Sequence, residues 1–252
     1  MKNKIFSLII VAILAAGCST DKEQIIQNDS LNFKSVESYL SFITADTDNR
    51  IIVKNLSSIE DPNFTSYISV FSKNESALTV DLNETTFNPL NVFVNEYGSA
   101  WGTHTYNFEE AYGTDIELST NHFNSAVTFY SPERIEITLS NLDNNKIIPG
   151  TQVSWNADSR NENGVVLAME YSPAIQTDSE IAGNYPEAIT GGIVVADNGS
   201  YTITANDLDS MPEGALVSFL VARAGFAIET NQNTDISIGI FSGINVGYRI
   251  NK

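Results

Sequence analysis

The chain has 252 residues, of which 13 are basic and 31 acidic, and its formal net charge is −18. Proteins bind nucleic acids and anionic lipid head groups through lysine and arginine, so this acidic surface argues against both as partners. We interpret the acidity as a solubility feature rather than a metal-attracting surface, and the 42% hydrophobic content is enough to bury a core.

The first part of the chain has the three regions of a secretory signal peptide. Lys2 and Lys4 supply positive charge, an apolar run covers residues 5–14, and small residues precede Cys18. The apolar run is about ten residues long, whereas a membrane-spanning helix needs about twenty. We therefore expect residues 1–17 to be removed as a signal peptide.

Leu14-Ala15-Ala16-Gly17-Cys18 resembles the lipobox of bacterial lipoproteins, with the leucine one place earlier than in the commonest pattern. The resemblance implies that the Cys18 thiol receives a diacylglyceryl group. Cys18 is the only cysteine in the sequence, so it has no disulfide partner. The alternative is an ordinary secreted protein with an incidental cysteine. We expect an outer-membrane lipoprotein in the cell envelope, anchored through Cys18, with residues 18–30 as a flexible tether.

Residues 31–131 are predicted to form an N-terminal β-rich domain. An Asn cap, early acidic residues and a closing Gly at residues 107–113 predict one helical turn. Residues 36–43 have helical spacing, although a strand is an open alternative there. Short apolar or alternating segments bounded by turn residues predict strands at residues 51–53, 66–71, 77–82, 90–94, 115–118 and 126–130.

Residues 132–252 are predicted to form a C-terminal β-sandwich domain. Pro132 marks the boundary, because proline cannot donate to a strand ladder and commonly starts a strand. About seven strands are the number expected of an immunoglobulin-like sandwich, and the predicted ones cover residues 135–139, 153–157, 165–171, 192–196, 201–205, 216–222 and 244–250. The predicted fold class is therefore all-β, with two β-sandwich-like domains.

Two kinds of residue in the C-terminal domain are explained by structure alone. Trp155 lies on an alternating strand and is predicted to pack between two sheets. Asn163-Gly164 and Asp197-Asn198-Gly199 each lie between predicted strands and are expected to form hairpin turns, with positive φ at glycine.

A set of motifs resembles two-domain β-sandwich lipoproteins of unknown function from Bacteroidota-type bacteria. The set consists of Trp155-Asn156-Ala157-Asp158, Asn163-Gly164-Val165-Val166, Phe108-Glu109-Glu110-Ala111-Tyr112-Gly113, Tyr130-Ser131-Pro132, Asp197-Asn198-Gly199-Ser200-Tyr201 and residues 208–214. The resemblance covers about residues 77–252, and its motifs are mostly structural. It implies an architecture and a location, and no activity.

The sequence contains no recognisable catalytic constellation, and we expect no enzyme activity and no cofactor. His104 and His122 are the only histidines, and no Gly-x-Ser-x-Gly motif is present. Glu109 and Glu110 are adjacent, so they point in different directions. Carboxylates that converge only in the fold leave a cryptic hydrolase as the least favoured alternative.

A calcium loop is a second alternative, at residues 158–164. This segment is rich in oxygen ligands and ends in Gly164, but Ser159 stands where the EF-hand spacing requires an aspartate. A site built from Asp158 and Asn161 stays open, while a polar hairpin without metal is the preferred interpretation.

Aromatic residues gather around Tyr97-Gly98-Ser99-Ala100-Trp101-Gly102. Aromatic side chains on loops stack on sugars or anchor protein partners, so Trp101, Tyr97 and Tyr106 are the candidate ligand-binding residues. Their burial in the N-terminal domain is the alternative. The predicted function is a surface binding or adhesion module for a glycan or another envelope protein. A structural or assembly component of the envelope is the second choice.

Overall fold

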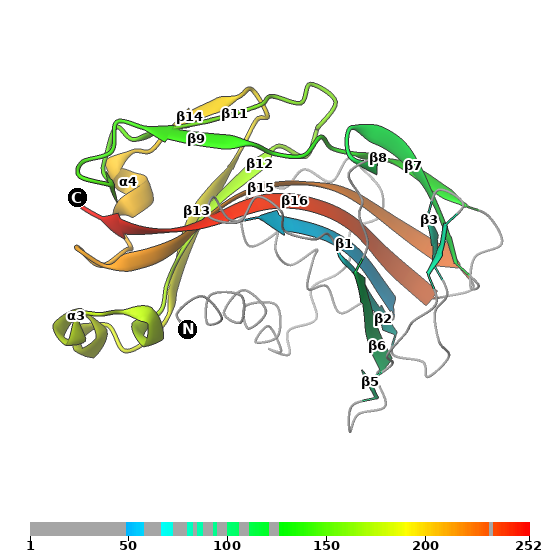
Figure 1. The fold of residues 1–252 in the computed structure, drawn as a ribbon, viewed down its shortest axis with the longest axis horizontal. Helices are drawn as coiled ribbons and strands as arrows, with labels where there is room; N and C mark the ends of the chain where they lie inside the picture. The colour runs from blue at the N-terminus through cyan, green and yellow to red at the C-terminus, as the bar shows by residue number, and fades with distance from the viewer. Residues whose placement is uncertain are drawn as a thin grey trace.

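The computed structural model describes residues 49–57, 67–72, 80–82, 85–87, 93–94, 100–105, 111–120, 126–231 and 234–252. Strands dominate these residues (Figure 1), as expected of a sequence rich in β-branched, aromatic and turn-forming residues. The predicted all-β class is thereby confirmed. No helix in these ranges is long and apolar enough to cross a membrane.

The main sheet is built around a long antiparallel hairpin of two strands, β15 (Leu216–Asn231) and β16 (Thr234–Ile250). On the β15 side lie β12 (Val165–Tyr171) and then β13 (Ile189–Val195), which is an edge strand. The strands on the β16 side are, in order, β1 (Asn49–Ser57), β2 (Tyr67–Ser72), β6 (Ala100–Thr105) and β5 (Phe93–Val94). The short β10 (Lys146–Ile147) pairs with the end of β16.

Two smaller sheets and three short helices complete the described structure. One sheet has the order β14 (Ser200–Thr202), β11 (Gln152–Trp155) and β9 (Ile137–Ser140). The other has the order β4 (Thr85–Phe87), β3 (Val80–Leu82), β7 (Thr114–Thr120) and β8 (Val127–Ser131). The helices are η2 (Pro173–Ile175), α3 (Ser179–Asn184) and α4 (Ala205–Leu208).

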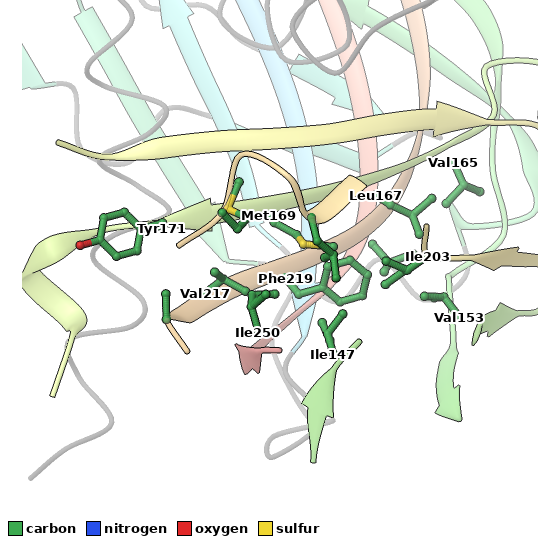
Figure 2. Packing of buried hydrophobic residues seen from close by; sticks show 14 of the residues in the cluster. Ile147, Val153, Val165, Leu167, Met169, Tyr171, Ile203, Val217, Phe219 and Ile250 are labelled. Carbon is green, nitrogen blue, oxygen red and sulfur yellow. The ribbon is translucent and has the colours of Figure 1, made fainter. Parts of the chain in front are cut away.

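The larger core lies between the main sheet and the β14-β11-β9 sheet (Figure 2). Every second residue of β12 enters it, because side chains alternate between the two faces of a strand. Trp155 is 7% exposed and belongs to this core, which confirms its predicted burial. The β12, β15 and β11 residues of the core include Val165, Leu167, Met169, Tyr171, Val217, Phe219, Val221, Val153 and Trp155.

The opposite face of the main sheet carries a second apolar cluster. Val166 and Ala168 of β12 contribute to it, together with Ala222 and Ala224 of β15 and Phe241 of β16. Residues 165–169 of β12 are therefore buried on both faces. A strand covered on both faces reads as a continuous apolar run, as residues 165–169 do in the sequence.

The strands predicted after Pro132 are present in the structure, but the two predicted hairpin turns were wrong. Strands β11 and β12, on either side of Gly164, lie in different sheets, as do β13 and β14 on either side of Gly199. Gly164 has φ +75° and Gly199 has φ +94°, so both predicted turn glycines have positive φ. A strand is present at each of the seven predicted places, although the bounds differ. Of the predicted helical turn at residues 107–113, the structure describes residues 111–113, where Ala111 is in a 3-10 turn and Gly113 has φ +74°.

The prediction was wrong about the extent of several strands. The last strand was expected over residues 244–250, but β16 begins at Thr234, and β15 continues nine residues past the predicted end at residue 222. Gly225, Gly239 and Gly243 interrupt the local pattern in this hairpin. Three strands were missed entirely, β4, β6 and β10, and β6 places Trp101 in a strand instead of a loop.

The main sheet takes strands from both predicted domains. Strand β1 belongs to predicted domain 31–131, and it pairs in parallel with β16 of predicted domain 132–252, from Asn49↔Ile236 to Ser57↔Ile244. A division at Pro132 would therefore run through a continuous sheet. The two-domain division and the immunoglobulin-like topology stay predictions.

Candidate functional site

The most conspicuous polar group in the described structure is Arg223, whose side chain is completely buried in β15. Its Nη1 lies 3.2 Å from Oδ2 of Asp197 and 3.8 Å from Oδ2 of Asp158. Its Nη2 donates to the backbone oxygen of Asn156 and, at 3.2 Å, to the Asn156 side-chain oxygen. A buried charge is costly unless it is paired and hydrogen-bonded, and the two carboxylates provide that pairing.

Asp158 is held by donors from several parts of the chain. Its Oδ2 accepts from the Tyr130 hydroxyl and from the Glu133 backbone N–H, each at 2.8 Å. Its Oδ1 accepts from the Arg160 backbone N–H at 3.0 Å. Burial alone would raise the pKa of Asp158, but these hydrogen bonds and the nearby Arg223 charge hold it below its usual range. Asp158 is therefore a carboxylate in the folded protein.

Asp197, the second carboxylate beside Arg223 Nη1, is also held by hydrogen bonds from the protein. Its Oδ1 accepts from the indole Nε1 of Trp155 at 2.8 Å, and its Oδ2 accepts from Nδ2 of Asn161 at 2.9 Å. The same Asn161 nitrogen also donates to the backbone oxygen of Gly164 at 2.8 Å. We call Arg223, Asp158, Asp197, Asn156 and Asn161 the Arg223 cluster.

The geometry of the Arg223 cluster bears on the alternative of a calcium loop at residues 158–164. Asp158 and Asn161, the two proposed ligands, are engaged with protein groups, and the guanidinium of Arg223 supplies the positive charge beside the carboxylate. Within the described ranges, no group of three or more His, Cys, Asp or Glu residues is arranged to hold a metal ion. The cluster joins β11, the residue 158–164 loop, the β13–β14 turn and β15, which is a structural role.

On the surface beside this cluster, Arg160 connects the loop to the β7–β8 hairpin. Its guanidinium lies 4.0 Å from the centre of the Tyr130 ring and forms an ion pair with Asp115 of β7. Burial, and then the hydrogen bond to Asp158, raise the pKa of the Tyr130 hydroxyl. Tyr130 therefore acts as a hydrogen-bond donor across the ordinary pH range.

A second polar group lies on the other face of the main sheet. Glu170 of β12 is in register with Thr190 of β13 and Ser218 of β15. Ser218 Oγ donates to Oδ1 of Asn245 at 2.7 Å, whereas the buried Oε2 of Glu170 has no hydrogen-bond partner. Burial raises the pKa of Glu170 to about 7, so this carboxyl exchanges its proton close to neutral pH.

An aromatic row crosses the far part of the main sheet. Trp101 of β6 is the register partner of Phe71 in β2 and of Phe93 in β5, and Phe71 is in turn the partner of Arg50 in β1. Residues directly opposite each other on neighbouring strands share one face of a sheet. We call Phe71, Trp101 and Phe93 the aromatic row.

The structure places the predicted site residues unevenly. Trp101 is in β6, next to the edge strand β5, and His104 is in the same strand. Cys18, Tyr97, Tyr106 and His122 lie outside the described residues. The sequence did not predict that Phe71 and Phe93 are register partners of Trp101, because the register between strands cannot be inferred from a local sequence pattern.

Sequence reasoning also missed Arg223 and Asp197 as a pair. One signal was available for Arg223, since it is the single charged residue within the otherwise apolar and small segment 215–228. A charged residue in a strand of that kind needs a buried counter-charge. The local sequence did not identify Asp197 as that counter-charge, because Asp197 begins a segment, Asp-Asn-Gly, that is typical of a hairpin turn.

Neither a protein-family model nor a curated protein matches this chain.

Proposed function

We propose that this protein is a non-catalytic, lipid-anchored binding module of the bacterial cell envelope, and that the aromatic row forms its ligand platform. The observation that carries the proposal is the register of β2, β6 and β5. It places Phe71, Trp101 and Phe93 opposite one another. Aromatic side chains are suited to stacking on the apolar faces of sugar rings.

The chemistry of the chain favours a neutral glycan as the ligand. A net charge of −18 disfavours anionic partners. The interactions that remain for binding a ligand are stacking and hydrogen bonding. Trp and other aromatic side chains supply contact area for stacking at low entropic cost. Arg50, the next position in the row, would add hydrogen-bond donors for sugar hydroxyls.

The engagement of the buried charged residues supports a binding role over a hydrolytic one. Paired carboxylates of a glycosidase flank an open substrate site. Asp158 and Asp197 instead both lie beside Nη1 of the buried Arg223 and accept hydrogen bonds from the protein. These two carboxylates therefore offer no position for a substrate between them.

The test is binding of the full-length protein, purified in detergent, to an array of neutral oligosaccharides. We expect binding that Trp101→Ala weakens by about thirtyfold or more, the cost of truncating an aromatic anchor. Tyr185→Ala is the matched control, because Tyr185 is 43% exposed and is the C-cap residue of α3. This helix precedes β13, which is at the opposite edge of the main sheet from β5. Absence of binding, or equal losses in the two variants, would contradict the proposal.

A further inference from the structure

The edge strand β13 has features that natural proteins usually avoid. It pairs with β12 over seven consecutive register partners, from Tyr171↔Ile189 to Val165↔Val195, without a bulge. Its sequence, Ile-Thr-Gly-Gly-Ile-Val-Val, contains no charged residue and no proline. Within the described part of the chain, no strand pairs with its outer side. Alternate residues of β13 therefore direct backbone N–H and C=O groups away from the sheet.

The other strands that end a sheet in the described ranges are shorter, and a short edge strand is itself a protection against pairing. The outer side of β15 is also unpaired from Ala224 to Asn231, but β8 approaches it at Gly225. Strands β5, β4 and β14 have two, three and three residues, and β9 has four. Strand β8 has five residues and is covered where it approaches β15 at Gly225. With seven residues, β13 is the longest strand that ends a sheet in the described ranges.

The structure also holds β13 in a fixed position. Ile189, Ile193 and Val195 pack against the larger core. Gly191 lies against the segment that follows α4, since a Cβ there would be 3.0 Å from side-chain atoms of Met211 and Ser210. Thr190 is exposed. A rigid strand with free backbone groups is pre-organised for strand addition, because little entropy is lost when it binds.

The charge around β13 selects the partner. Glu187 precedes the strand and Glu180 lies in the preceding α3, and both are exposed. A second copy of this chain would bring the same acidic residues and a second net charge of −18 to the contact. We propose that β13 is the docking site for a partner protein, which adds an extended, uncharged strand with basic residues at its ends.

The test uses the full-length protein in detergent and a synthetic peptide probe of alternating valine and threonine, flanked at each end by two lysines. Binding is measured by fluorescence anisotropy. We expect the peptide to bind, and a version with N-methylated backbone amides to bind at least about tenfold more weakly, because it cannot donate to the strand edge. A glutamate-flanked version should also bind more weakly, because of the acidic surroundings.

Two lysine variants locate the contact. Thr190→Lys places a charge on the edge of β13 and should weaken binding of the lysine-flanked peptide by at least about tenfold. Thr202→Lys places the same charge at an exposed position of another edge strand, β14, and should leave binding unchanged. Trp101→Ala should also leave it unchanged, since this inference is independent of the glycan proposal.

Several outcomes would overturn the proposal. One is the absence of peptide binding to the wild-type protein. Another is that the wild-type protein binds the N-methylated and unmethylated peptides with equal affinity. This second comparison uses only the wild-type protein, so it does not depend on the folding of a variant. Equal losses in Thr190→Lys and Thr202→Lys would indicate general attraction to an acidic surface. Sedimentation that reveals a dimer, abolished by Thr190→Lys, would identify a second copy as the occupant of the edge.

Discussion

Arg223 carries its charge inside the protein, where only neighbouring groups can stabilise it. If Arg223 is replaced by Met, which has a similar length, Asp158 and Asp197 stay buried and lose their cation. Breaking a buried ion pair in this way costs about 3–5 kcal/mol. We expect Arg223→Met to lower the free energy of unfolding by that amount, measured by urea denaturation at neutral pH.

Arg249 provides the matched control for this prediction. It is a half-buried arginine of β16 that donates to the backbone oxygen of Gly214 and to the Thr177 hydroxyl. Arg249→Met removes hydrogen bonds without leaving a buried carboxylate unpaired, so a loss of about 1–2 kcal/mol is expected. Equal losses in the two variants would show that the Arg223 cluster adds nothing beyond ordinary hydrogen bonds.

Glu170 makes stability depend on pH in the direction opposite to a salt-bridged carboxylate. Its pKa is about 7 in the folded protein and has an ordinary value of 4.5 without burial. Between these values the folded protein binds more protons than the unfolded chain, so stability falls as the pH rises through this window. The loss is complete above about pH 7.

Glu170→Gln removes that dependence, because glutamine stays neutral. The full pKa shift would correspond to about 3 kcal/mol, and we expect about 1–2 kcal/mol because the side chain is only half-buried. The variant should therefore be more stable than wild type at about pH 8, and the difference should shrink towards about pH 5. Thermal melts across this range measure it, and a difference that does not change with pH would contradict the assignment.

At the scale of elements, the β15–β16 hairpin is held to β8 by a close backbone approach at Gly225. A Cβ at this position would lie 2.2 Å from the backbone oxygen of Tyr130 and 3.1 Å from Cδ of Pro132. Backbone atoms cannot move aside as the end of a side chain can. Gly225→Ala should therefore separate β8 from β15 and destabilise the protein by about 2 kcal/mol or more.

Gly239 serves as the control for Gly225. It lies in the same hairpin, and a Cβ there would meet only the Phe226 ring, at 3.6 and 3.7 Å, which is ordinary van der Waals contact. Gly239→Ala should change the melting temperature little. If both variants melt at the same temperature, the contact between β8 and β15 does not contribute to stability.

Elements could be predicted from the sequence where the signal was local. Trp155 stood in an alternating strand, and Gly164 and Gly199 stood in turn sequences, so burial and positive φ followed from short-range patterns. The length of the β15–β16 hairpin was underestimated, because glycines and small residues interrupt the alternation of apolar and polar residues over its far half. The aromatic row depends on register between β2, β6 and β5, which three short segments cannot specify by themselves.

At the scale of the whole molecule, the lipid anchor that the sequence predicts at Cys18 would hold the protein at a membrane. Cys18→Ser should abolish lipidation, because a serine hydroxyl does not replace the thiol as acyl acceptor. In detergent phase separation, the wild-type protein should enter the detergent phase and the variant should stay in the aqueous phase. Ser19→Ala, which alters the next residue, should behave as wild type. If the Cys18→Ser variant enters the detergent phase as the wild-type protein does, Cys18 is not the anchor.

The parallel pairing of β1 with β16 has a consequence for the order of synthesis. Asn49 leaves the ribosome long before its register partner Ile236, so β1 cannot gain its second neighbour until β16 has been synthesised. Pairings between such distant segments form slowly and expose strand edges in the meantime. A premature stop within β16 would therefore remove a neighbour of β1 and expose β1, β2 and β6, although these strands lie far upstream in the sequence.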